Sequence, residues 1–128
     1  MHDHTKLDVW RLTRRFVVEV YEATACFPAE ELYGLTSQLR RAAVSVAANL
    51  AEGAGRGSPR DFARFVRYSG GSVAECVALL TLATDLHLLS EETRAGLAAT
   101  ATRITNMLKR LDEALTRPTA REAGSIPG

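Results

Sequence analysis

The segment EGAGRGSPR, residues 52–60, has glycines at alternate positions and carries the residue types of a phosphate-binding loop. Glycine-rich loops bind nucleotides where backbone N–H groups converge on phosphate at a strand-to-helix junction, usually beside a Lys-Ser/Thr pair. Here an alanine-rich segment of helical period precedes Gly53, and no such pair follows. Ser58 supplies a helix N-cap, and Pro59 suits the first helical position. The segment therefore favours a corner between two helices, with a phosphate-binding loop as the alternative.

The histidines and carboxylates form no recognisable catalytic or metal-binding pattern. His2 and His4 lie near the start of the chain without further ligands at fixed spacing, and His87 falls at the expected end of a helix. Adjacent acids such as Glu91-Glu92 point about 100° apart on a helix, so they do not form an inward-facing pair. We therefore expect no catalytic residues, no metal site and no cofactor, in a protein that is not an enzyme.

Bulk composition indicates an ordinary globular domain. The chain has 128 residues, of which 46% are hydrophobic and 24% charged, and this length matches one domain. Cys26 and Cys76 lack the spacing of a metal knuckle or a redox pair, so we expect free thiols and a reducing compartment. No apolar run approaches the roughly 20 residues of a membrane span. The sequence favours a cytoplasmic protein without membrane partners.

Arginines are the residues most suited to binding a partner. They make up fourteen of the sixteen basic residues, and residues 37–72 hold six of them against two acids although the whole chain carries only +1. The six candidates for nucleic-acid binding are Arg40, Arg41, Arg56, Arg60, Arg64 and Arg67. The last three fall within about 60° on a helical wheel and predict a basic ridge, whose guanidinium groups can each bind phosphate with two contacts. The alternative is a solvated helix face on which the arginines pair with Asp61 or Glu75.

Four helices must position these residues. The apolar spacing predicts helices over residues 7–26, 36–52, 58–87 and 90–115. Thr36 or Ser37 caps the second helix, Ser58 the third and Ser90 the fourth, while Phe27-Pro28 ends the first, followed by a short turn in the connector. With no convincing strand, we expect an all-α fold, an antiparallel up-and-down four-helix bundle over residues 1–116. Residues 117–128 are expected to form a flexible tail.

The glycine pair Gly70-Gly71 is the main objection to a straight third helix, since each glycine costs a helix up to about 1 kcal/mol relative to alanine. It predicts either a kink or the close approach of a neighbouring backbone, and we favour the close approach.

The second helix carries more apolar surface than one core can use. Its apolar and small residues cover roughly 200° of the wheel, about twice an ordinary core-facing stripe. We expect the excess to be buried against another copy of the chain, with Ala43, Val44, Ala47 and Ala51 at the interface. The alternative is an exposed alanine-rich surface.

A resemblance to a known family rests on residues 27–75. The matching motifs are Phe27-Pro28, Tyr33-Gly34-Leu35, Gln38-Leu39-Arg40-Arg41-Ala42, Ala51-Glu52-Gly53 and Gly71-Ser72, with Glu31, Ser45, Asn49, Arg56, Phe62, Phe65 and Glu75. This run resembles the small four-helix-bundle proteins encoded by intervening sequences in bacterial 23S ribosomal RNA genes. Tyr68 and Ser69 depart mildly from the family pattern.

The resemblance implies an up-and-down bundle. Through similarity to accessory proteins of diversity-generating retroelements, it also implies a ring of five subunits with a basic surface, working beside a reverse transcriptase. Two functions follow as hypotheses. The first is a homo-oligomeric assembly, expected to have five subunits, that binds RNA or DNA through phosphate contacts. The second is a protein-interaction scaffold or an accessory subunit of a nucleic-acid enzyme.

Overall fold

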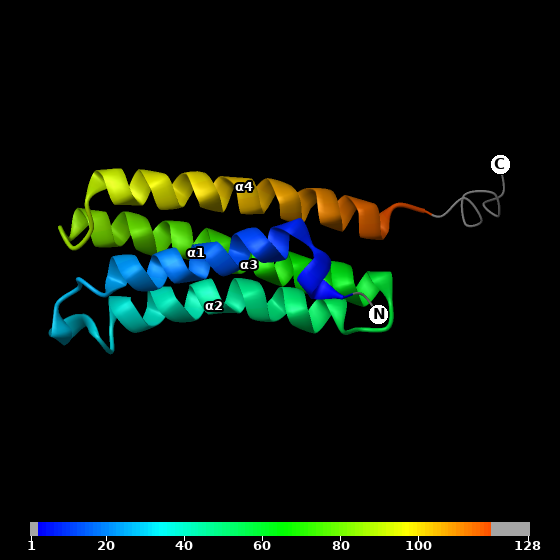
Figure 1. The fold of residues 1–128 in the computed structure, drawn as a ribbon, viewed down its shortest axis with the longest axis horizontal. Coiled ribbons are helices and arrows are strands. Elements are labelled where there is room, and N and C mark those ends of the chain that lie inside the picture. Colours follow the sequence, from blue (N-terminus) through cyan, green and yellow to red (C-terminus); the bar gives the residue numbers. More distant parts are fainter. Residues whose placement is uncertain (1–2, 119–128) are drawn as a thin grey trace.

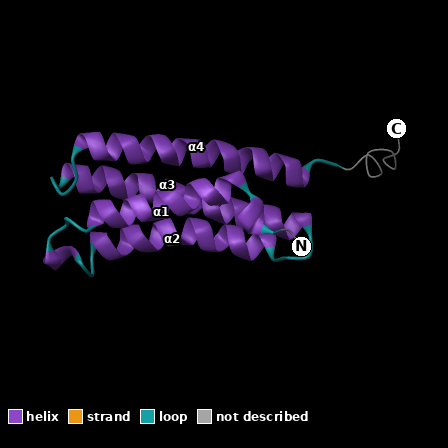
Figure 2. Cartoon of the chain, in the orientation of Figure 1, coloured by secondary structure: helices purple, strands orange, loops and turns teal. Residues whose placement is uncertain are grey.

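The computed structural model describes residues 3–118, and four long α-helices account for most of them (Figure 1). The helices are α1 (Asp8–Thr24), α2 (Leu35–Ala54), α3 (Pro59–Asp85) and α4 (Glu91–Thr116). Two short 3-10 turns, η1 (His4–Lys6) and η2 (Ala29–Glu31), precede α1 and α2. The described residues contain no strand (Figure 2), which confirms the all-α prediction. Of the tail expected over 117–128, residues 119–128 lie outside the described part.

Each helix packs against its neighbours in the chain, and α1 also packs against α4. Short connectors force consecutive helices to run antiparallel, so the bundle is up-and-down. The α1–α2 and α3–α4 connectors lie at one end of the molecule, which we call the loop end (Figure 1). The α2–α3 corner lies at the opposite end with the start of α1 and the end of α4, and we call this the corner end.

The core is a continuous column of aliphatic and aromatic side chains contributed by all four helices. Burial of one such side chain contributes about 1.5–3 kcal/mol, so this column supplies most of the driving force for folding. Its largest fully buried members are Phe16, Phe62, Leu39, Leu50, Leu80 and Ile104.

Two of the predicted helix starts are confirmed. The Oγ of Ser58 accepts a hydrogen bond from the Asp61 N–H at 3.1 Å, and the Oγ of Ser90 accepts one from Thr93 at 3.1 Å. Each serine satisfies an N–H group that has no partner within its helix. The corner between α2 and α3 is therefore built as a helix start, as the sequence indicated.

The predicted start of α2 is wrong. The helix begins at Leu35, and neither Thr36 nor Ser37 caps it, because both already lie inside its first turn. The Leu35 N–H donates instead to the Glu31 carboxylate at 3.3 Å. A residue of the preceding 3-10 turn thus supplies the acceptor that a serine or threonine would normally provide.

The glycine predictions need two corrections. The expected corner began at Gly53, but α2 continues through this residue to Ala54. A Cβ atom at Gly53 would lie 2.7 Å from the Cβ of Phe65, so glycine is needed here for close packing of α2 on α3. At Gly70 and Gly71, by contrast, a Cβ would meet nothing within 4 Å. The close backbone approach expected within the chain at this pair is wrong, and α3 runs unbroken through it.

The C-terminus of α3 is closed by a left-handed residue. The helix ends at Asp85, one or two residues earlier than expected, and His87 has φ of 61°. The Leu88 N–H then donates to the Ala83 carbonyl oxygen at 2.9 Å. This geometry satisfies the last carbonyl groups of the helix, so His87 has a structural position at the loop end.

Candidate nucleic-acid interface

Arg40 is committed to the end of α1 rather than free for phosphate. Its Nε donates to the Oγ1 of Thr24 at 2.8 Å, and its Nη2 donates to the Tyr21 carbonyl oxygen at 3.3 Å. The guanidinium also lies 4.5 Å from the centre of the Tyr21 ring. Because these contacts join α2 to the C-terminus of α1, Arg40 has a structural role that the sequence analysis missed.

Three further candidates have acidic partners within the chain. Arg56 pairs with Glu52 at 2.8 Å, and Arg64 lies 3.4 Å from the carboxylate of Asp61. The expected alternative, in which ridge arginines pair with acids, therefore holds for Arg64 with Asp61, whereas Glu75 is exposed and makes no ion pair with the described residues.

Arg67 makes the best-defined of these pairs. Its Nε and Nη2 donate to the two carboxylate oxygens of Asp112 on α4, at 3.1 and 3.0 Å. These hydrogen bonds, together with the carboxylate charge, raise the pKa of Arg67. The arginine side chain remains largely exposed, and exposed ion pairs contribute only about 0–1 kcal/mol. A phosphate group can therefore compete with the carboxylate at little cost.

Arg41 and Arg60 complete the predicted set. Both side chains are exposed, and neither makes a hydrogen bond or an ion pair with the residues that the structure describes. They do not lie together, because Arg41 belongs to the loop-end half of α2 and Arg60 to the first turn of α3. The six arginines therefore do not form one continuous basic surface on the single chain.

Phe65 organises the arginines of the corner end. The apolar spacing along α3 favours a buried position for Phe65, but the structure leaves it only half-buried. The guanidinium groups of Arg56 and Arg64 lie 4.8 and 5.1 Å from the centre of its ring, and Tyr68 packs edge-on at 5.4 Å. Cation–π contacts of this kind hold guanidinium groups in place without neutralising them. The three-residue spacing of Phe65 and Tyr68 was the sequence signal that could have predicted their ring contact.

The structure corrects part of the prediction of which α2 residues form the self-association face. Ala43 is completely buried in the core of its own chain, so it cannot line an outer face. Val44 is 42% exposed, and Ala47 and Ala51 are half-buried. The outward surface of α2 therefore centres on Val44, with Ala47 and Ala51 at its edges.

A groove of about 690 Å³ runs beside Val44, and we call it the α2 groove. Its wall includes two apolar side chains from the α1–α2 connector, Leu32 and Tyr33, which are 48% and 93% exposed. Arg40 and Arg41 supply its charged groups. The remaining lining residues are Tyr21, Thr36, Ser37, Ser45 and Ala48. Sequence reasoning did not assign Leu32 and Tyr33 to an apolar surface, because they lie outside the helical period.

The two thiols lie in different surroundings. Cys76 is buried in the core, and this burial raises its pKa to about 12, whereas Cys26 is exposed.

Among residues 3–118, no three histidine, cysteine or carboxylate side chains lie close enough together to bind a metal ion. None of the described helices is both long and apolar enough to cross a membrane.

No curated protein sequence matches the chain. A family model described as 23S rRNA-intervening sequence protein matches residues 5–110, which include α1, α2, α3 and most of α4.

Proposed function

This chain belongs to the 23S rRNA-intervening sequence protein family, and we propose that it is a non-enzymatic, cytoplasmic homo-oligomer that binds RNA or DNA. Five subunits are the number that we propose, and arginine–phosphate contacts are the means of binding. The observation that carries the proposal is the α2 groove, with its unusually exposed apolar wall.

The α2 groove supports self-association. A single chain leaves Tyr33 almost fully in water beside Leu32 and Val44, and contiguous exposed apolar surface on a soluble protein marks an interaction site. The small side chains of Ala47, Ala48 and Ala51 allow another helix to approach closely. A closed ring buries the same surface on every subunit and leaves none of it open.

A charge placed in the groove tests this assembly. We expect V44E to lower the subunit number measured by light scattering, because a carboxylate would be desolvated at the interface. V18E is the matched control, since Val18 is a comparably exposed valine (55%) that does not line the groove. The assembly proposal fails if both variants keep the mass of the wild type or both lose it equally.

Exposed arginines support nucleic-acid binding within such an assembly. Arg60 has no acidic partner among the described residues, and the surface pairs of Arg56, Arg64 and Arg67 are weak enough for phosphate to replace the carboxylates. Symmetry repeats each arginine around the assembly, so that a modest charge per chain becomes a multivalent contact with phosphates. Base-specific recognition is not part of the proposal.

Salt titration tests the nucleic-acid proposal. We expect binding of mixed RNA and DNA to weaken steeply as salt rises, and the triple variant R60E/R64E/R67E to abolish it, because both changes remove phosphate attraction. The control R60K/R64K/R67K keeps the positive charges and should retain most of the affinity. Absence of binding by the wild type at low salt would reject the proposal.

A protein-interaction scaffold is the second candidate. The observation in its favour is that Arg40, Arg56, Arg64 and Arg67 already have acceptors within the chain. In this case the arginines only make contacts within the chain, and the α2 groove serves a polypeptide partner, such as a reverse transcriptase or another nucleic-acid enzyme. An intact oligomer without measurable affinity for nucleic acid at low salt would favour this second candidate.

A further inference from the structure

Charge is distributed unevenly along the bundle axis. The hydroxyl oxygens of Ser45 and Ser72 lie 2.8 Å apart near the middle of α2 and α3, and a plane across the bundle at this contact divides it into two sides. The corner side comprises residues 3–13, 46–71 and 104–118, and the loop side comprises residues 16–44 and 73–102. On α1 and α4 the division falls at the middle of each helix, so Arg14, Arg15 and Arg103 are assigned to neither side.

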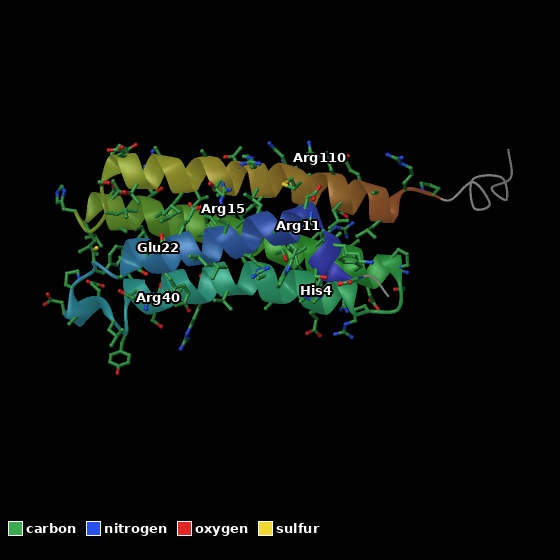
Figure 3. The ribbon with its side chains drawn as sticks, in the orientation of Figure 1. His4, Arg11, Arg15, Glu22, Arg40 and Arg110 are labelled. Carbon is green, nitrogen blue, oxygen red and sulfur yellow. The ribbon has the colours of Figure 1, made fainter. Side chains whose placement is uncertain are left out.

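The corner side holds nine basic and six acidic residues, a net charge of +3. The loop side holds three basic and eight acidic residues, a net charge of −5. Figure 3 shows Arg11 and Arg110 toward the corner end, Arg15 near the middle and Glu22 toward the loop end. Although the net charge of the whole chain is only +1, its two ends therefore carry opposite charges.

Pairing within the chain sharpens this difference. Five cations of the corner side are exposed and make no ion pair with the described residues: Lys6, Arg60, Lys109, Arg110 and Arg117. On the loop side, Arg41 alone among the described cations has no hydrogen-bonding or ion-pair partner.

The acids follow the opposite trend. On the corner side, Glu113 is the one described acid without a hydrogen-bonding or ion-pair partner. On the loop side five described acids lack one: Glu22, Glu30, Glu75, Asp85 and Glu92. Unpaired charges set the field that an approaching polyanion meets, so this field attracts phosphates at the corner end and repels them at the loop end.

We propose that nucleic acid docks on the corner end of the bundle, with the loop end directed away from it. This inference rests on the proposed nucleic-acid function and adds four residues per chain to its site, namely Lys6, Lys109, Arg110 and Arg117. The phosphate contacts then come from Arg60 on α3, Lys109 and Arg110 on α4, Lys6 before α1 and Arg117 after α4. Arg56 and Arg64, held against Phe65, border the same end.

The two family arginines of α2 take no part in this contact. Arg40 is hydrogen-bonded to residues of α1, and Arg41 lines the α2 groove on the loop side of the molecule. In this proposal, binding depends on where along the bundle axis a positive charge lies, and not on membership of the set of six arginines predicted from the sequence.

Helix α4 offers a matched pair of arginines for the test. Arg103 and Arg110 are both exposed and without an ion pair to the described residues, and seven residues, or two turns, separate them on the same helix face. R103E and R110E change the charge identically and differ only in position along the axis. R41E adds a third point on the loop side.

The probe is a short labelled RNA duplex, titrated at several salt concentrations between about 50 and 200 mM, a range over which phosphate contacts weaken steeply. We expect R110E to weaken binding about tenfold and to lower the salt slope by about one, as for a lost phosphate contact. R103E should have a smaller effect, and R41E should leave affinity within about twofold of the wild type. Light scattering on each variant checks that the subunit number is unchanged.

Three results would overturn the inference. If R110E bound like the wild type, or if R103E or R41E lost as much affinity as R110E, the nucleic acid would not dock at the corner end, although the proposed function would stand. If the wild type bound vesicles containing phosphatidylglycerol but no RNA, the corner end would serve a membrane surface. If the wild type bound neither, the proposed function would fall together with the inference.

Discussion

At the scale of single residues, the two cysteines differ in their exposure to solvent. Burial raises the pKa of Cys76 to about 12, so at neutral pH almost none of it is the reactive thiolate. Cys26, just beyond α1, is open to solvent. Neither thiol is needed for the proposed function, but each reports on the packing around it.

We predict that one thiol per native chain reacts rapidly with a disulfide reagent at about pH 8, and both in denaturant. C26S should remove the rapid phase, and C76S should leave it unchanged. Since the pKa of Cys76 is raised, its labelling should increase as pH rises toward about 12. Two rapidly reacting thiols in the native protein would show that Cys76 is not buried as described.

Arg40 shows why single-residue roles were harder to predict than residue types. Its acceptors on Thr24 and Tyr21 lie 16 and 19 residues earlier in the chain, so no local pattern pairs them. Phe65 similarly sits at the border of the apolar stripe, where a helical wheel cannot separate half-burial from full burial. The charged residues could be counted from the sequence, whereas their hydrogen-bonding and ion-pair partners became known only from the packing of the helices.

At the scale of helices, local signals were reliable where the capping group lies next to the helix. Ser58 and Ser90 bond N–H groups three residues ahead, so both helix starts could be predicted. The start of α2 could not, because its acceptor is Glu31 and depends on the geometry of the η2 turn. The fold class followed from apolar periodicity over long helices, which a single misplaced cap does not alter.

Two glycines with opposite surroundings give a test of helix packing. We predict that G53A destabilises the protein by about 1–3 kcal/mol, since the added Cβ would overlap Phe65. G71A should instead stabilise it by up to about 1 kcal/mol, because alanine favours a helix and its Cβ meets nothing within 4 Å of the same chain. Urea denaturation measures both changes. Equal effects of the two substitutions would contradict the α2–α3 packing.

At the scale of the whole molecule, apolar surface and charge lie in different places. The α2 groove flanks the loop-side half of α2, whereas the unpaired cations gather at the corner end. The groove can therefore bury itself in a neighbouring subunit without covering the proposed phosphate contacts. Because the two surfaces are separate, the same molecule can self-associate and bind nucleic acid at the same time.

The most direct test of this account is the mass of the wild-type protein in solution. Light scattering at micromolar concentration should give a multiple of the 13.9 kDa chain, with five subunits as the expected number. Such a mass would be expected if the apolar wall around Val44 and Tyr33 is covered by another copy. A mass of 13.9 kDa across the micromolar range would contradict it, because that wall would then remain open to water in every molecule.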